Sequence, residues 1–237
     1  MTAESADAEP ETTTTRLVLV RHGESQAQVD RVVGGPTGCT GLSDLGRRQV
    51  AALAQRWHGS GLVVDRLLAS TLPRAVETAE LLAPALGGLV VSQDPELVEL
   101  EPGECDGLSW DDYQARYHVD MRADPYAELS PGGESVAGFL LRIGRALHRI
   151  AVDHPGQTVV VACHGGVIDG SLACFLGVAV QRAADLDLRT TNSAVTEWLV
   201  EAEKGRPLHW ALRRYNDAAH LEALAAGEGP LDPPSIA

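Results

Sequence analysis

The chain has 237 residues, of which 44% are hydrophobic but only 4% aromatic, and its formal net charge is −14. This length allows one large α/β domain or two small ones. An apolar content carried by Ala, Leu and Val suits helices packed on a sheet better than a β-sandwich. The acidic charge disfavours nucleic acid and anionic membrane surfaces as partners, yet a few arginines in a cleft still allow a small anionic substrate.

The cysteines and the ends of the chain indicate a compartment. The four cysteines form neither a C-x-x-C pair nor a zinc spacing, which argues against a metal site or a disulfide framework. No segment has the length and apolarity of a membrane span, and the N-terminus lacks a basic-then-apolar signal pattern. We therefore expect a soluble, cytoplasmic protein.

A single domain between two tails is predicted. Residues 1–15 are acidic, Thr-rich and poor in large apolar groups, so we expect them to be disordered. Residues 16–226 show no internal repeat and no linker, which favours one catalytic domain. Residues 227–237 have the composition of a flexible C-terminal tail.

The first apolar run, over 17–20, is typical of a strand buried on both faces of a parallel sheet. It ends at Arg21, His22 and Gly23, followed by residues compatible with the first turn of a helix. This order places polar groups at the carboxyl edge of the sheet, where α/β proteins bind ligands. Arginine donors, close backbone N–H groups and a helix N-terminus suit an anion, and His22 is the neutral nucleophile of the set. Taken alone, the stretch also fits an ordinary polar strand exit.

The next elements bring a second cation to the same edge. A Gly-rich loop over 33–41 is close enough in sequence to border the His22 turn. A helix is predicted from the cap at Ser43 to about residue 58, and a parallel strand over 62–69. A Ser/Thr cap and Pro then start a helix that carries Arg74 in its opening turns. A solvated surface cation is the alternative for this arginine.

An acidic segment over 94–107 follows a short predicted strand over 89–92. Within it, Glu99 lies between two apolar residues, a setting that could desolvate the carboxyl group and raise its pKa as a general acid requires. Most carboxylates in such a run are solvated. The fallback choices for an acid are Glu101 and Glu104.

The chain then repeats its opening pattern. Helices are predicted over 109–118 and 134–154, and a buried strand over 157–162 leads into His164 and two glycines at the start of another helix. If the two strands lie side by side, His22 and His164 meet, with two helix N-termini aimed at one spot.

The last predicted elements are two strands over 191–200 and 208–213, joined by a polar turn and paired antiparallel, and a short helix over 218–226. An unpaired edge strand near Val195 to Val200 is a possible basis for a homodimer, which we state as a hypothesis.

In this order, the motifs resemble the histidine phosphatase superfamily, also called the phosphoglycerate-mutase-like family. The resemblance covers roughly residues 16–199, most of the chain. It implies an α/β three-layer sandwich with a mostly parallel central sheet flanked by helices and a phosphate pocket at the carboxyl edge. The motifs that carry it are RHGES from Arg21, STLPRAVETA around Arg74, LVELEPGECDG around Glu99, PGGES from Pro131, and HGG from His164.

The resemblance also implies roles for the site residues. His22 is the nucleophile that becomes a phosphohistidine, and Arg21, Arg74 and His164 hold the phosphoryl oxygens. Glu99 protonates the leaving alcohol and then activates water. The backbone N–H of Gly165 adds a donor, and no metal or organic cofactor is expected.

One position departs from the family pattern. Many members have Asn at the position of Gln28, where it helps bind phosphate, and the longer amide here either reaches the same oxygen or leaves the pocket altered. Asn192 also matches a family pattern, and we expect it to support the pocket by hydrogen bonding.

Three functions share these motifs. The first is hydrolysis of a small phosphorylated metabolite, the second is phosphoglycerate-mutase-type transfer, and the third is phospho-ligand binding without catalysis. Mutases of the family carry a longer insertion between the acid and the second histidine, whereas Glu99 and His164 are only 65 positions apart here. Because shielding a phosphohistidine from water needs a covering element, the short spacing favours hydrolysis.

Overall fold

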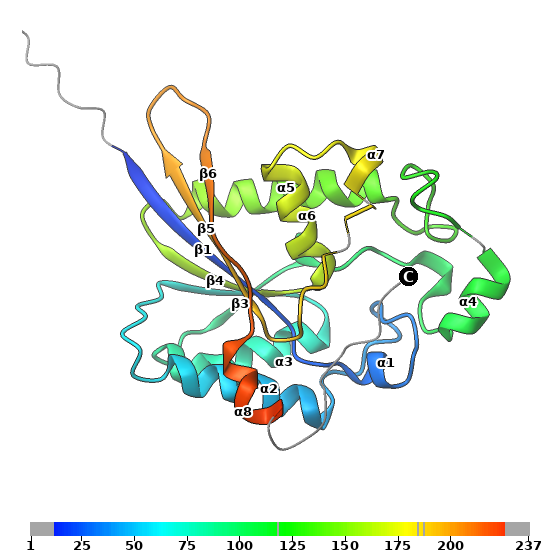
Figure 1. Ribbon diagram of the computed structural model, residues 1–237, viewed down its shortest axis with the longest axis horizontal. Coiled ribbons are helices and arrows are strands. Elements are labelled where there is room, and N and C mark those ends of the chain that lie inside the picture. The colour runs from blue at the N-terminus through cyan, green and yellow to red at the C-terminus, as the bar shows by residue number, and fades with distance from the viewer. Residues whose placement is uncertain (1–11, 118, 184, 187, 226–237) are drawn as a thin grey trace, which may run out of the picture.

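The computed structural model describes residues 12–117, 119–183, 185–186 and 188–225, and it has three layers, a six-stranded sheet with helices on both faces (Figure 1). The strand order is β3-β2-β4-β1-β5-β6. The first four of these strands run parallel, β5 is antiparallel to β1, and β6 is antiparallel to β5. The predicted fold class is confirmed. The strands are β1 (Thr13–Arg21), β2 (Arg66–Ser70), β3 (Val91–Asp94), β4 (Thr158–Cys163), β5 (Val195–Ala202) and β6 (His209–Asp217).

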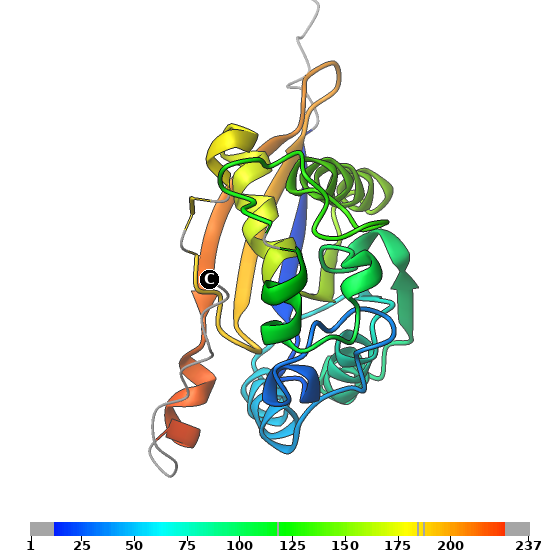
Figure 2. The same cartoon turned by 90° about the vertical axis from the view of Figure 1, so that its right-hand side faces the viewer.

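The helices form the two outer layers, which Figure 2 shows from the side. One face of the sheet carries α2 (Asp44–Trp57) and α3 (Pro73–Leu82), and the other carries α5 (Val136–Asp153) and α6 (Gly165–Phe175). No helix in the described ranges is long and apolar enough to cross a membrane. The shorter helices are α1 (Gln26–Val29), α4 (Trp110–Tyr117), α7 (Val180–Ala183) and α8 (Glu222–Ala225), with 3-10 turns η1 (Ala83–Leu86), η2 (Pro95–Leu97), η3 (Gly103–Cys105) and η4 (Ala219–Leu221).

The first strand explains why both faces of the sheet are covered. Leu17 and Leu19 point toward the α5/α6 layer, and Val18 and Val20 point toward the α2/α3 layer. All four side chains are at most 2% exposed. Removing such a side chain from water contributes about 1.5–3 kcal/mol as an upper value, so the uninterrupted apolar run requires a helix layer on each side.

The strand ends place the site. Arg21 of β1 is opposite Cys163 of β4, and Ala69 near the end of β2 is opposite Ala162 of β4. The first bond beyond the ladder joins the N–H of His22 to the carbonyl of Cys163 at 2.8 Å. The carboxyl ends of three neighbouring strands therefore meet at one edge of the sheet, as the sequence predicted.

The first strand begins earlier than expected. It starts at Thr13, and Thr13, Thr14 and Thr15 pair with the far end of β5. The predicted disorder was therefore wrong for these three residues, because pairing with a neighbouring strand outweighs their polar composition. Residues 1–11 and 226–237 lie outside the described ranges, so the rest of both predicted tails stays a prediction.

Several local expectations also need correction. The helix after the first strand is only the four-residue α1, and α3 is preceded by Leu72 with no side-chain cap bond instead of the expected Ser/Thr cap. β5 is not an edge strand, because it pairs with both β1 and β6, as the expected antiparallel hairpin requires. The edges of the described sheet are β3 and β6. The homodimer stays a prediction, but β5 no longer supports it as an edge strand.

Candidate active site

The turn that carries His22 is held by α2. The N–H of Glu24 donates to Gln49 Oε1 at 2.9 Å, and the carbonyl of Glu24 accepts from the N–H of Ser43 at 2.9 Å. A Cβ added to Gly23 would lie 2.5 Å from the carbonyl oxygen of Gly46, so only glycine permits this backbone approach. The packing of α2 against the turn thus fixes the backbone next to His22.

His22 is 4% exposed, and its two ring nitrogens have different surroundings. Nδ1 lies 2.6 Å from the carbonyl of Gly23, which assigns the proton to Nδ1. Nε2 is then left as the acceptor, 3.0 Å from Nε of Arg74. The backbone carbonyl of His22 also accepts from Nδ2 of Asn192 at 3.0 Å. The expected support by Asn192 is confirmed, and Nε2 is the ring nitrogen that faces Arg74.

His164 is completely buried at the start of α6 and presents its other nitrogen to the same arginine. Its Nε2 lies 2.8 Å from Oγ of Ser70, at the end of β2. Its Nδ1 accepts from Nε of Arg74 at 3.2 Å. The centroids of the His22 and His164 rings are 5.2 Å apart. The two imidazoles that the sequence paired are therefore together, and an acceptor nitrogen of each shares the Nε–H group of Arg74.

The two arginines complete a positively charged wall. Arg74, in the first turn of α3, is 5% exposed and also donates through Nη1 to the carbonyl of Gly34 at 2.6 Å. Arg21 donates through Nη1 to the carbonyl of Thr190, while its buried Nε has no partner among the described residues. A buried donor without a partner is rare in native proteins, so this N–H is available to an anionic ligand. The surface-cation alternative for Arg74 is excluded by its burial.

Burial and the arginines keep both imidazoles neutral. Burial, followed by the charges of Arg74 and Arg21, lowers the pKa of His22 well below its ordinary value of 6.5. Burial, followed by Arg74 and the other histidine, does the same to the pKa of His164. Burial also lowers the pKa of Arg21 below its ordinary value. At neutral pH the site holds two neutral nitrogen bases beside two guanidinium groups, a combination suited to an anion.

Glu99 lies at the N-terminus of α6, beside the second histidine. Its Oε2 accepts from the N–H of Gly166 at 2.9 Å, and its Oε1 accepts from the N–H of Leu100 at 3.0 Å. A Cβ on Gly166 would lie 2.1 Å from Oε1, so the second glycine of HGG makes room for this carboxylate. The fallback carboxylates, Glu101 and Glu104, have exposed side chains instead.

Gln28 has another use in this structure. Its Oε1 accepts from the N–H of Ser25 at 3.0 Å, which caps α1, and from Nδ2 of Asn192 at 3.2 Å. These bonds place the amide beside the pocket, behind the backbone of the His22 turn. Phosphate binding by Gln28 stays a prediction.

Sequence reasoning missed the residues that orient the site. Ser70 could have been found, because it ends a strand at the same edge as both histidines. Thr190 and Asp169 carried no signal. Oγ1 of Thr190 donates to Oδ1 of Asp169 at 2.7 Å, and burial raises the pKa of Asp169 to about 7 despite that bond. Their link to Arg21 exists only in the folded chain.

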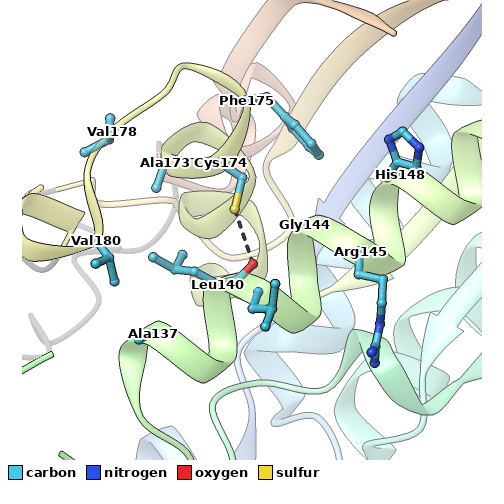
Figure 3. A pocket seen from close by; sticks show the side chains of 11 residues that line it. Ala137, Leu140, Gly144, Arg145, His148, Ala173, Cys174, Phe175, Val178 and Val180 are labelled. Carbon is cyan, nitrogen blue, oxygen red and sulfur yellow. Dashed lines mark hydrogen bonds between the residues drawn. The ribbon is translucent and has the colours of Figure 1, made fainter. Parts of the chain in front are cut away.

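One cavity adjoins this site, and another lies away from it. One of about 180 Å³ is bounded by Gly34 and Glu99. A larger one, of about 620 Å³, lies between α5, α6 and α7 (Figure 3). The side chains around it include Leu140, Phe175 and Val180, and none of its residues belongs to the predicted site. Within the described ranges, no group of three or more His, Cys, Asp and Glu side chains could hold a metal ion.

Two neutral imidazoles beside two guanidinium groups, at the carboxyl edge of a parallel sheet, define a phosphoryl-transfer type of site. The sequence model of the histidine phosphatase superfamily (branch 1) matches residues 17–217. The chain belongs to this family. It is an enzyme of the histidine phosphatase type.

Similar proteins carry both phosphatase and mutase names. "Metal-independent phosphoserine phosphatase" of Arabidopsis thaliana is 28% identical over 224 residues, which cover 93% of this chain and 89% of that protein. "Phosphoglycerate mutase-like protein 4" of the same plant is 29% identical over 211 residues, 87% of this chain and 86% of that protein. The structure of mycobacterial glucosyl-3-phosphoglycerate phosphatase with VO3 superposes with a TM-score of 0.72 at 27% identity, covering 85% of this chain and 99% of that chain.

Proposed function

We propose that this chain hydrolyses a small phosphomonoester without a metal ion, through a phosphohistidine on His22. The observation that carries the proposal is the position of Arg74, whose Nε lies 3.0 Å from Nε2 of His22 and 3.2 Å from Nδ1 of His164. A phosphoryl group attached to His22 would replace the contact between Arg74 and Nε2 with contacts to its oxygens. Charge that spreads over those oxygens in the transition state is then stabilised where it forms.

In the first step, the lone pair of His22 Nε2 forms a bond to phosphorus while the bond from phosphorus to the ester oxygen breaks. The unpaired Nε of Arg21, the guanidinium of Arg74, His164 and the N–H of Gly165 stabilise the transferred oxygens. The departing oxygen takes a proton from Glu99. The proton stays on Nδ1, hydrogen-bonded to the carbonyl of Gly23, so the ring carries the positive charge of the phosphohistidine.

In the second step, water attacks phosphorus on the side that the alcohol has left. Glu99, now ionised, accepts the proton from this water, and the bond between phosphorus and Nε2 breaks. Inorganic phosphate leaves, and His22 returns to its neutral form. The low pKa of the buried imidazole favours this return. One carboxyl group thus serves both steps.

The size of the adjoining space supports a small substrate. The cavity of about 180 Å³ shares Gly34 and Glu99 with the site, so an alcohol bound there has its ester oxygen near the acid. The names of the similar proteins suggest phosphoserine and glucosyl-3-phosphoglycerate as members of a test panel. We therefore propose a small phosphorylated metabolite as the substrate.

The test is release of inorganic phosphate from a panel of phosphomonoesters by the wild type, His22→Ala and Glu99→Gln, with EDTA present. We expect turnover by the wild type, at least about 1,000-fold less by His22→Ala, and a trapped acid-labile phosphoenzyme only where His22 is present. Turnover that EDTA abolishes, or that survives in His22→Ala, would refute the mechanism.

The same preparation separates the other two functions. A mutase converts 3- to 2-phosphoglycerate when bisphosphoglycerate is present, and the name of the Arabidopsis relative makes this assay worthwhile. Silence in both assays, together with retained phosphate binding, would favour a binding module. No protein or nucleic acid partner is proposed.

We also propose that the protein works in the cytoplasm. All four cysteines are free in the structure, and three of them are buried, which is typical of reducing compartments. Fractionation of the source cells with an antibody checks this proposal, and recovery in an extracellular fraction would refute it.

A further inference from the structure

The segment that carries Glu99 has no regular structure of its own. Glu99 lies between η2 and η3, outside any helix or strand. Its side chain bonds to two backbone N–H groups, those of Gly166 and Leu100, and the second belongs to the same segment. A general acid has to lie about 2.6–3.2 Å from the oxygen that it protonates, and its position has to be held to within about 0.5 Å. Something outside the segment must therefore fix the backbone at this residue.

Arg142 of α5 contacts that backbone directly. Its Nη1 donates to the carbonyls of Glu96 at 2.7 Å and Val98 at 3.0 Å, and its Nη2 donates to the carbonyl of Glu99 at 3.2 Å. The side chain is 13% exposed. A single guanidinium group thus bonds to three carbonyls within four residues, the last of them that of the acid itself.

The remaining donors of Arg142 fix the guanidinium itself. Nε donates to Oε1 of Glu134 at 2.9 Å, and Nη2 donates to Oε2 at 2.6 Å. Glu134 in turn donates its N–H to the carbonyl of Glu101 at 2.8 Å. All five N–H donors of the arginine are therefore used, in the fork geometry that a lysine cannot reproduce.

Arg149, another arginine of α5, makes a different kind of contact with this segment. Arg149 reaches the same segment, but it bonds to the side-chain carboxylates of Asp94 at 2.6 Å and Glu96 at 3.1 Å. Its side chain is 42% exposed. These bonds are to side chains, and no bond of Arg149 to the backbone at Glu99 is found among the described residues. Arg149 is therefore the matched control.

We propose that Arg142 is a positioning residue for the general acid, acting by fixing the backbone of residues 96–99 so that the Glu99 carboxyl group faces the leaving oxygen. The proposal rests on the proposed function of Glu99. It assigns Arg142 no contact with the phosphoryl group. If Arg142 acts in this way, its substitution lowers kcat/KM most for esters whose leaving group needs a proton.

The test compares two esters. An alkoxide leaves only with a proton, whereas p-nitrophenolate leaves as an anion, so a misplaced acid slows the first far more than the second. Because kcat/KM covers only the steps up to loss of the alcohol, we measure kcat/KM for p-nitrophenyl phosphate and for the best alkyl phosphate of the panel. We expect Arg142→Lys to lower the alkyl value about 10–100-fold and the p-nitrophenyl value less than about 3-fold.

Two variants frame this result. Glu99→Gln should show the same selectivity to a larger degree, about 100–1,000-fold, and Arg149→Lys should leave both values within about 2-fold of the wild type. If Arg142→Lys does not fold, Glu134→Gln removes the charge that orients the guanidinium and should shift the ratio of the two values in the same direction. Equal losses on both esters would assign Arg142 a purely structural role and overturn the proposal.

The failure of the underlying function looks different. If Glu99→Gln shows the leaving-group selectivity and Arg142→Lys does not, the positioning proposal fails and the function of Glu99 stands. If Glu99→Gln shows no selectivity, the acid has been misassigned, and the proposal for Arg142 is refuted with it.

Discussion

The two strand-His-Gly segments look alike in sequence but are built differently. After β4, His164 is followed at once by the 11-residue α6. After β1, His22 is followed by a turn and the four-residue α1, and the turn is braced by α2 instead. The expected pair of helix N-termini is therefore one helix N-terminus and one braced turn.

The ring contacts differ in the same way. The backbone carbonyl of Gly23 holds Nδ1 of His22, so Nε2 faces the site, whereas the hydroxyl of Ser70 holds Nε2 of His164, so Nδ1 faces it. Which nitrogen faces the site is thus decided by the partner of the other one. Two histidines with similar neighbours in sequence can take different roles, nucleophile and phosphoryl binder, for this reason.

The largest expected effect on kcat comes from replacing the second histidine. His164→Gln removes the second imidazole proposed to bind the phosphoryl group but leaves His22, the proposed nucleophile, so kcat should fall about 100–1,000-fold while a phosphoenzyme still forms. A rapid acid quench with radiolabelled substrate measures both quantities. If His164→Gln forms no phosphoenzyme and His22→Ala does, the assignment of the nucleophile is reversed.

The next prediction compares the turn after His22, which packs on α2, with the start of the helix after His164. Gly23→Ala places a Cβ 2.5 Å from the Gly46 carbonyl oxygen, whereas Gly165→Ala meets Arg21 at an ordinary 3.4 Å. We expect Gly23→Ala to lower the free energy of unfolding by about 2–3 kcal/mol and Gly165→Ala to change it by less than about 1 kcal/mol. Urea unfolding midpoints check this, and equal losses would contradict it.

A buried carboxyl group on α6 has no counterpart after the first histidine. Burial raises the pKa of Asp169 from 3.8 to about 7 in the folded chain, so its stabilising contribution is present below the unfolded pKa and is lost as pH rises through the folded one. Asp169→Asn should therefore gain about 1–2 kcal/mol relative to wild type between about pH 4.5 and about pH 8, after allowance for solvent screening.

Urea unfolding at several pH values measures that gain. A difference between Asp169→Asn and wild type that stays constant over this pH range would mean that the Asp169 carboxyl group ionises normally.

The smallest effect concerns the hydroxyl that holds the second ring. Ser70→Ala removes the partner of His164 Nε2 but leaves Arg74 in place, so kcat/KM should fall about 3–10-fold, the worth of one neutral hydrogen bond. Ser92→Ala, at an exposed position of β3, is the control and should be unchanged. No loss at Ser70 would show that packing alone orients the ring.

Much of the site followed from local patterns. The apolar runs before His22 and His164 predict strands buried on both faces, and parallel strands end at the same edge of a sheet. The histidines could therefore be placed at one edge from the sequence, whereas the adjacency of the two strands came from the structure. The motif order added Arg74 and Glu99, and the structure places both at the same edge.

The tertiary structure decided what holds these groups. The bracing by α2, the bond from Ser70 and the bonds from Arg142 each join segments that are distant in the chain, for example 94 positions apart for Ser70 and His164. Such bonds have no periodicity or local spacing that a sequence could reveal. The sequence by itself therefore determined which chemical groups reach the sheet edge, while packing between distant segments determined which atom of each group faces the substrate.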